Sequence, residues 1–199
     1  MAPRDRRAER TAATRREILD AAWGLVGTEG LAALTMRALG ARVGMRAQSL
    51  YGYFTSKHAI FDAMFGEANQ ELGQRLRDEV PPGGDPEARL RRRTAVFARF
   101  CVENPVRYQL LFQRTIPGFE PSPESYAPAV ELLDDTRVLL RECGVAAPHG
   151  LDAWTAVTGG IVAQQNANEP GGRRWLQLTD QLTDMYLGFY RDKQTRGTR

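Results

Sequence analysis

The sequence is poor in the residues that build metal sites and disulfide frameworks. It contains two cysteines, Cys101 and Cys143, and two histidines, His58 and His149. The cysteines lie far apart and neither belongs to a Cys-x-x-Cys pair, so a structural zinc site or a disulfide scaffold is not expected. We interpret both thiols as small hydrophobic core side chains, and the sequence predicts neither a metal nor a cofactor.

Long apolar runs are also missing. No segment approaches the roughly 20 apolar residues of a membrane span, and no apolar stretch follows the arginine-rich N-terminus as in a signal peptide. The sequence therefore predicts a cytoplasmic protein that does not contact the membrane. Enzymatic machinery is sparse as well, since no nucleophile with a neighbouring base, glycine-rich phosphate loop or metal-ligand spacing occurs. With 199 residues, 42% of them hydrophobic, the chain can bury a core without staples.

Positive charge is concentrated near the N-terminus. Residues 1–60 contain ten Lys and Arg against five Asp and Glu, whereas residues 61–199 contain seventeen against nineteen. Two interpretations of the first residues stay open: a flexible basic arm that neutralises the phosphates of a polyanion, or a tail that only improves solubility. The arginine triplet at residues 91–93 is expected on a solvated helix face.

Helical periodicity dominates, and no stretch alternates polar and apolar residues as a half-buried strand would. The pattern predicts an all-α fold of about nine helices, with an N-terminal three-helix helix-turn-helix domain followed by a C-terminal antiparallel helical bundle domain. The expected helices cover about residues 14–29, 36–43, 46–52, 56–79, 86–104, 105–113, 129–143, 151–168 and 173–192.

Proline and glycine clusters mark the expected boundaries between helices. The segment PPGGDP at residues 81–86 ends one helix, and four prolines between Pro117 and Pro128 indicate a loop. The expected organisation is a flexible basic arm at 1–12, a helix-turn-helix domain at 13–60, a second helical domain at 61–192 and a frayed tail at 193–199.

The most informative stretch is residues 35–54, TMRALGARVGMRAQSLYGYF. Two short helices joined by a tight turn at Gly44 fit a helix-turn-helix, whose second helix enters the major groove of DNA. Gly40 costs about 1 kcal/mol of helix propensity relative to Ala, so we expect the two helices to approach closely there. Burial of Met45, Leu50 and Phe54 would leave Ala47, Gln48 and Tyr51 on the outer face.

The chain resembles the DNA-binding domain of the TetR family of transcriptional regulators over roughly residues 13–65, which include this stretch. Three positions depart from the family pattern: Gly40, Arg46 and Tyr53 stand where an Ala, a small hydroxyl residue and a His are usual. Arg46 can contact a phosphate or a guanine, and Tyr53 keeps a hydrogen-bond donor for a phosphate. The resemblance rests on Ile18, Leu31, Thr35, Leu39, Gly44, Leu50, Tyr51, Phe54 and Lys57.

Lys57 adds a physical argument of its own. A cation in the first turn of a helix opposes the helix dipole, so its position makes sense if a DNA phosphate docks there. A lysine that only faces water is the alternative interpretation. The predicted DNA-binding residues are Thr35, Arg46, Ala47, Gln48, Tyr51, Tyr53 and Lys57.

The rest of the chain resembles, more weakly, a TetR subgroup named for a Trp, a His and a Gly. The similarity lies in residues 103–112 and 154–159, where Thr158 replaces the usual His. The resemblance implies a ligand-binding and dimerisation domain whose last two helices form a four-helix interface between two subunits. Small residues on one of these helices and apolar residues on the other agree with this; the predicted interface residues are Gly159, Ala163, Leu178, Leu182, Met185 and Phe189.

A cavity between the bundle helices is the expected site of a small hydrophobic ligand. An aromatic stripe at helical spacing can equally be ordinary core. The sequence thus predicts a homodimeric repressor released by its ligand from a palindromic double-stranded DNA operator. Two alternatives remain, namely the same fold regulated by a protein partner, and a helical enzyme. The candidate ligand-binding residues are Phe97, Cys101, Tyr108, Phe112, Trp154 and Thr158.

Overall fold

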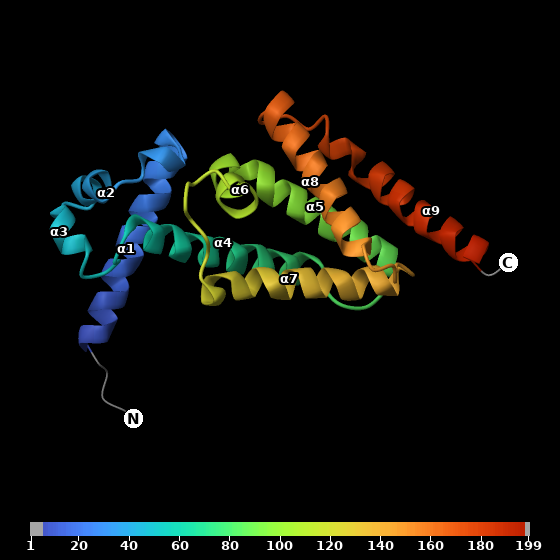
Figure 1. Cartoon of the computed structure of the whole chain (residues 1–199), viewed down its shortest axis with the longest axis horizontal. Helices are drawn as coiled ribbons and strands as arrows, with labels where there is room; N and C mark the ends of the chain where they lie inside the picture. The colour runs from blue at the N-terminus through green and yellow to red at the C-terminus, as the bar shows by residue number, and fades with distance from the viewer. Residues whose placement is uncertain (1–5, 198–199) are drawn as a thin grey trace. The chain divides into compact units, whose positions relative to one another are not determined.

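The computed structural model of the chain describes the backbone of residues 6–197 and the side chains of residues 6–191. Within these residues the chain forms nine α-helices and two short 3₁₀ helices, with no strand (Figure 1). The prediction of an all-α fold with about nine helices is confirmed. None of the described helices is long and apolar enough to cross a membrane.

The helices divide into two compact units. The first combines the described residues up to Ala68 with Val106–Tyr126, and the second combines Asn69–Pro105 with the residues from Ala127 onward. This division differs from the expected boundary at residue 60. The reason is that Phe61 and Met64 are buried in the same hydrophobic core as the helix-turn-helix.

The first unit contains the N-terminal helices and a later insertion. Its elements are α1 (Arg6–Glu29), the 3₁₀ helix η1 (Leu31–Ala33), α2 (Met36–Arg42), α3 (Ala47–Leu50), the first half of α4 (Lys57–Glu79), and α6 (Pro105–Phe112) apart from its first residue. In Figure 1, α2 lies beside α1, and α3 follows α2 after a tight turn. The third predicted helix, residues 46–52, is therefore shorter than expected, because a turn replaces its last residues.

Helix α1 begins at Arg6, eight residues before the expected start at Thr14. Residues 6–12, expected as a flexible arm, therefore form its first turns, while the rest of that arm lies outside the described residues. The apolar periodicity missed these turns because they carry no buried face. Their Arg, Ala and Glu residues are nevertheless strong helix formers, and no Gly or Pro interrupts them.

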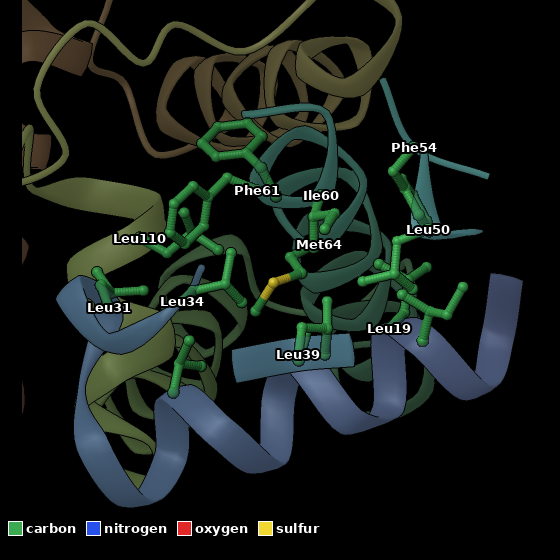
Figure 2. Packing of buried hydrophobic residues seen from close by; sticks show 14 residues of the cluster. Leu19, Leu31, Leu34, Leu39, Leu50, Phe54, Ile60, Phe61, Met64 and Leu110 are labelled. Carbon is green, nitrogen blue, oxygen red and sulfur yellow. The ribbon is translucent and has the colours of Figure 1, made fainter. Parts of the chain in front are cut away.

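One hydrophobic cluster holds the first unit together. Leu19 of α1, Leu39 of α2 and Leu50 of α3 point toward Ile60 and Met64 of α4 (Figure 2). Burying a side chain of this size contributes about 1.5–3 kcal/mol, so the cluster fixes α3 against α1 and α4. The labelled members are Leu19, Leu31, Leu34, Leu39, Leu50, Phe54, Ile60, Phe61, Met64 and Leu110.

The second unit is a helical bundle in which α5 packs against both α8 and α9 (Figure 1). Its core includes Trp154, whose ring meets that of Tyr186 at 4.9 Å between centroids. The elements are the second half of α4, α5 (Pro86–Glu103), α7 (Pro123–Glu142) after its first turn, α8 (Gly150–Asn168), the 3₁₀ helix η2 (Leu176–Leu178) and α9 (Thr179–Gly197).

Helix α7 starts at Pro123, inside the segment that we expected to be a loop. The Ser122 hydroxyl accepts a hydrogen bond from the Ser125 backbone N–H (3.2 Å), which caps the helix, and a proline is favoured at the first helical position. Pro128 then removes one N–H from the helix. The carbonyl that loses this partner belongs to Glu124, which is exposed to water.

Helix α9 starts at Thr179 instead of about Arg173, and it continues to Gly197. The preceding residues are held in a turn by side chains of α8 and its end: the Trp175 N–H donates to Gln165 (2.9 Å) and the Arg174 N–H to Glu169 (2.7 Å). Most of the expected frayed tail is therefore helical, and residues 198–199 lie outside the described residues.

Arginine side chains tie the bundle helices to one another. Arg93 of α5 donates to the Leu132 carbonyl (2.8 Å) and the Thr136 hydroxyl (3.0 Å) of α7, and Arg91 pairs with Asp184 of α9. The interpretation of residues 91–93 as a solvated face is therefore wrong for two of the three. Periodicity alone could not show this, because the partners are more than 35 residues away.

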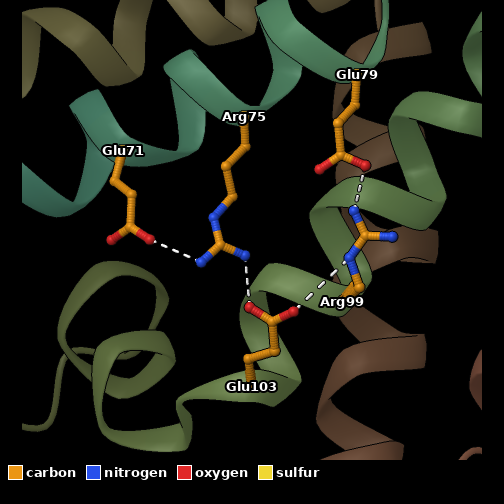
Figure 3. A network of polar contacts seen from close by, with 5 residues as sticks. All are labelled: Glu71, Arg75, Glu79, Arg99 and Glu103. Carbon is orange, nitrogen blue, oxygen red and sulfur yellow. Dashed lines mark hydrogen bonds and ion pairs between the residues drawn. The ribbon is translucent and has the colours of Figure 1, made fainter.

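A second set of ion pairs joins the latter half of α4 to α5 (Figure 3). Arg75 contacts Glu71 and Glu103, and Arg99 contacts Glu79 and Glu103. The Arg75 guanidinium also lies 5.3 Å from the centre of the Phe100 ring. The hydrogen bond and charge of Glu103 raise the pKa of Arg75.

Candidate nucleic-acid interface

Three helices of the first unit begin at the residues that the sequence predicts for DNA binding. Thr35 precedes α2, and its hydroxyl accepts a hydrogen bond from the Ala38 N–H (3.0 Å). Arg46 precedes α3 without capping it through its side chain. Ser56 caps α4 by accepting from the Ala59 N–H (3.0 Å), and Lys57 is the first residue of that helix. Helix N-termini attract anions, so all three starts are suited to phosphate contacts.

The turn between α2 and α3 depends on two glycines. Gly44 has a φ of +67°, a conformation that other residues rarely adopt. A Cβ atom on Gly40 would lie 2.7 Å from the Met45 carbonyl oxygen and 3.3 Å from the Ala47 nitrogen. The close approach expected at Gly40 is present, and it fixes the angle at which α3 leaves α2.

Helix α3 presents an uncharged polar face. Gln48 and Tyr51 are exposed, Tyr51 to 49% of its surface, whereas Leu50 and Phe54 are buried. Ala47 is half-buried because its backbone abuts Gly40, so Gln48 and Tyr51 dominate the face that could meet base edges.

Tyr53 differs from these exposed residues. It is half-buried and packs against the core of the first unit. Its carbonyl oxygen accepts a hydrogen bond from Arg15 of α1. A phosphate contact from its phenol group stays a prediction.

Three cations without a carboxylate partner occur in the same segment of the chain as this face. No Asp or Glu occurs between Gly30 and Phe61. In this segment, which the structure describes in full, the side chains of Arg37, Arg46 and Lys57 are exposed and form no ion pair, whereas Arg42 lies 3.9 Å from the Glu29 carboxylate. An exposed cation with no internal partner is free to meet an anion outside the molecule, and Arg37 joins the candidates although the sequence analysis did not select it.

Arg15 is a second residue that the sequence analysis did not place in the site. Its guanidinium lies 4.1 Å from the centre of the Phe54 ring, a cation–π contact, and it also donates to the Tyr53 carbonyl. Arg15 therefore holds the end of the α3 turn against α1. Its place among the N-terminal arginines suggests a role in charge alone, whereas its contacts with Tyr53 and Phe54 are those of a positioning residue.

Four of the candidate ligand-binding residues lie in the second unit. Cys101 is fully buried on α5, four residues after the half-buried Phe97. Trp154 is packed into the bundle core, and the Thr158 hydroxyl donates to the Trp154 carbonyl (3.0 Å) within α8. Trp154 is thus a core residue in this structure, and the other three stay candidates.

The other two candidates lie on α6 in the first unit. Tyr108 is buried, and its ring lies 5.7 Å from that of Phe112, which is 44% exposed. Phe112 lines a surface cavity of about 410 Å³ formed by first-unit residues, and none of the other candidates lines it. The structure therefore does not gather the six residues around one described cavity.

The predicted dimer residues are unevenly covered. Met185 and Phe189 on α9 are 61% and 54% exposed, and Leu178 and Leu182 are half-buried. On α8, Gly159 and Ala163 are half-buried, and nothing lies within 4 Å of a Cβ built on Gly159. Met185 and Phe189 therefore form an apolar surface on α9 that the described residues leave more than half exposed.

The described residues contain no group of His, Cys, Asp and Glu side chains that could hold a metal ion. Cys143 is half-buried, and burial together with the nearby carboxylates of Asp85 and Glu142 raises the pKa of its thiol to about 11. A thiol with so high a pKa is poorly reactive.

Comparison with known proteins identifies the N-terminal segment. Residues 18–64 match the family model described as bacterial regulatory proteins of the tetR family. This span lies inside the region where the sequence resembles that family, so the resemblance is confirmed there. No curated protein matches the chain.

Solved structures cover most of the chain at low sequence identity. SCO4313, a proposed regulatory protein, matches with a TM-score of 0.74 and 23% identity over 94% of this chain and 100% of its own. PfmR of Thermus thermophilus, a TetR-family transcriptional regulator, matches with a TM-score of 0.64 and 22% identity over 85% and 96%. FadR of Bacillus subtilis, solved with stearoyl-CoA, matches with a TM-score of 0.71 and 13% identity over 86% and 97%. The chain therefore has the TetR-type fold, with a helix-turn-helix domain followed by a helical C-terminal domain.

Proposed function

We propose that this chain, with its TetR-type fold and N-terminal domain, is a TetR-family transcription regulator that binds a palindromic operator as a homodimer. It acts as a repressor that a small hydrophobic ligand releases from DNA. The observation that carries the proposal is an exposed, uncharged face with Gln48 and Tyr51, in a segment that contains three exposed cations without an ion pair and no carboxylate. No catalytic residue is assigned.

In this proposal α3 enters the major groove. Gln48 can bond an adenine edge in two places, and Arg46 a guanine or a phosphate. Lys57 and Arg37 contact phosphates, which position the protein without reading sequence. The Thr35 hydroxyl accepts from Ala38, so its own hydrogen stays available for a phosphate oxygen.

The homodimer places two copies of α3 on the two halves of a palindrome. Its proposed interface is formed by α8 and α9. Leu182, Met185 and Phe189 recur at spacings of three and four residues, which aligns them on one face of α9, and Leu178 lies four residues earlier at the end of η2. Met185 and Phe189 are more than half exposed in the single chain, so a second copy would cover apolar surface that is otherwise wet.

Dimerisation has a direct test. Met185→Asp would place an unpaired charge inside the interface, at a cost of several kcal/mol. Sedimentation should show the variant as a monomer with weak operator affinity. Val138→Asp, at an exposed apolar position of α7, is the matched control and should leave the assembly unchanged. A dimeric Met185→Asp protein would move the interface elsewhere.

The ligand response is supported by the fold and by a neighbour that binds an acyl-CoA, FadR of Bacillus subtilis. Helix α4 contributes residues to both compact units. A ligand that binds one conformation of the chain better than another shifts the population toward that conformation, and α4 can pass this change to the helix-turn-helix. Within the bundle, Phe97, Cys101 and Thr158 are the proposed contact residues. Membership of the Trp-His-Gly subgroup stays part of this proposal.

The decisive experiment is selection of bound sequences from random double-stranded DNA, followed by affinity measurements at several salt concentrations. Gln48→Ala should relax base preference at one position by about 1–3 kcal/mol, whereas Lys57→Ala should weaken all sequences alike and lower the salt slope by about one. If no sequence is enriched, or if neither variant alters binding, the proposed DNA-binding function is wrong.

A further inference from the structure

A surface cavity of about 410 Å³ lies in the same compact unit as the helix-turn-helix. Its walls come from α6, from the segment that follows α6, and from single residues of α4 and α7. The bundle, where the proposed function expects the ligand, contributes none of the described lining. This volume falls within the range of small-molecule sites, about 300–1,000 Å³.

Aromatic rings form much of the lining. Phe65 of α4 stacks on Tyr126 of α7, with 6.0 Å between ring centres and 21° between ring planes, and it meets Phe119 at 6.5 Å. Phe112 of α6 adds a fourth ring. Phe112 and Tyr126 are 44% and 42% exposed, so two rings offer flat apolar surface to an incoming molecule. Planar aromatic molecules are the natural complement of such a surface.

One cation and one anion border the cavity. The Arg114 guanidinium lies 3.9 Å from the Glu120 carboxylate, and both side chains are at least four-fifths exposed. An ion pair so exposed and so long is weak, so an anionic ligand group can compete with Glu120 for Arg114. The lining therefore favours a ligand that combines aromatic rings with an acidic group.

The wall of the cavity is fixed in place by a carboxylate. Asp62 of α4 accepts hydrogen bonds from the Ser122 N–H (2.6 Å), the Ser122 hydroxyl (2.8 Å) and the Ser125 hydroxyl (2.9 Å). These bonds anchor the end of the 113–122 segment on α4. The cavity is thus preformed, which lowers the entropic cost of binding.

We propose that this cavity binds a planar aromatic acid and that the bound molecule weakens DNA binding. The link to DNA is Phe119, which lines the cavity and also packs on the start of α4. Its ring lies 5.9 Å from that of Phe61 and 6.0 Å from that of His58. His58 directly follows Lys57, the proposed phosphate contact, so a ligand that displaces Phe119 disturbs the α4 N-terminus. This second step rests on the proposed function, whereas binding to the cavity does not.

The binding test uses 8-anilinonaphthalene-1-sulfonate, which joins aromatic rings to a sulfonate and fluoresces in apolar sites. Calorimetric and fluorescence titrations should show saturable binding to the wild-type chain. Gln113→Trp places a bulky ring on an exposed lining residue and should weaken binding at least tenfold. Val138→Trp makes a comparable change on exposed α7, outside the cavity, and should leave it unchanged. Equal binding by the wild-type and Gln113→Trp proteins would overturn the proposed site.

The role of the acidic group has its own pair of variants. Arg114→Gln should weaken binding of the sulfonate several-fold, but it should not change binding of uncharged N-phenyl-1-naphthylamine. Arg92→Gln removes an exposed arginine from α5 and is the control. If both probes respond alike to Arg114→Gln, the assignment of an acidic ligand is wrong.

The coupling test measures binding to DNA that the protein itself has selected. A saturating concentration of the sulfonate should lower DNA affinity at least tenfold for the wild-type chain and should have no effect on Gln113→Trp. Unchanged wild-type affinity would overturn the coupling. A protein that selects no DNA but still binds the probe in the Gln113-dependent manner would contradict the proposed function and would leave the cavity site standing.

Discussion

The helix-turn-helix segment and the bundle contain arginine and lysine side chains that differ in their contacts. In the helix-turn-helix segment, Arg37, Arg46 and Lys57 are exposed and have no carboxylate partner. In the bundle, Arg75 and Arg91 each contact two carboxylates, one of them on another helix. Net charge alone cannot distinguish an unpaired cation from one that joins two helices, whereas the contacts of each side chain can.

The difference shows which cations contribute to the free energy of folding and which are available for binding. A bundle arginine contributes to the folded state by joining helices, so its removal should lower stability. Arg37, Arg46 and Lys57 make no contact of this kind, and their removal should cost affinity for a polyanion instead. The following experiments test this difference by measuring DNA binding and stability after substitutions in each unit.

The largest effect is expected from removing the three unpaired cations together. The Arg37→Ala, Arg46→Ala, Lys57→Ala protein should lose about three units of salt slope, because each phosphate contact contributes about 0.9. Its thermal stability should stay near that of the wild type. Fluorescence anisotropy with selected DNA at several salt concentrations measures the slope.

The matched control removes the same charge from the bundle. Arg92, Arg137 and Arg141 are exposed arginines of α5 and α7 that do not join helices, and their joint replacement by Ala lowers the net charge equally. The salt slope of this control should stay within about half a unit of the wild type, since distant exposed charges are screened beyond about 10 Å. An equal loss in both proteins would mean that net charge, not position, governs DNA binding.

Arg93 should show the reverse behaviour. Burial lowers the pKa of its guanidinium, yet it donates to the Leu132 carbonyl and the Thr136 hydroxyl. Hydrogen bonds to charged groups contribute about 1.5–3 kcal/mol, partly offset by the desolvation of the cation, so Arg93→Met should cost about 2 kcal/mol of unfolding free energy. Urea denaturation measures it, with the exposed Arg92→Met as control. A stable Arg93→Met protein with weakened DNA binding would contradict the comparison.

A substitution at Gly40 tests how closely α2 packs against the turn that leads into α3. Gly40→Ala gains about 1 kcal/mol of helix propensity but places a Cβ 2.7 Å from the Met45 carbonyl oxygen, at an overpacking cost of about 1–3 kcal/mol. We expect a net loss of about 1 kcal/mol in urea denaturation. Gly27→Ala in α1 meets nothing within 4 Å and should stabilise the protein slightly. A gain at Gly40 would show that the α2–α3 turn can shift.

The helix-turn-helix could be predicted from sequence because its signals are local. Thr35 and Ala38 are three residues apart, and Gly44 needs its left-handed conformation within the turn itself. The bundle contacts of Arg93 span about forty residues, so no local pattern contains them. Contacts between residues that are close in sequence can be predicted from a single sequence, whereas contacts between distant residues cannot.

The site shows the same limit. Helical spacing selects Gln48 and Tyr51, the helix-dipole argument selects Lys57, and the structure exposes all three. Arg15 was missed as a positioning residue because its partners, Tyr53 and Phe54, lie nearly forty residues later. The aromatic cavity could not be predicted for a related reason: Phe65, Phe119 and Tyr126 meet only once α4, the 113–122 segment and the start of α7 pack together.

The last prediction concerns two thiols whose reactivity depends on how far each is buried. Burial and the carboxylates of Asp85 and Glu142 raise the pKa of Cys143 from 9.0 to about 11, so at pH 8 its thiolate fraction is about a hundredfold below that of an ordinary thiol. Ser49→Cys would place an exposed thiol on α3, in a segment that carries cations and no carboxylates. Because the thiolate is the reactive form, iodoacetamide should modify residue 49 at least a hundredfold faster than Cys143 at pH 8. The advantage should shrink as the pH rises from 9 toward 11, where Cys143 ionises. Equal rates at pH 8 would show that burial and the neighbouring carboxylates do not raise the pKa of the Cys143 thiol, because a thiol with an ordinary pKa would react as fast as the exposed residue 49.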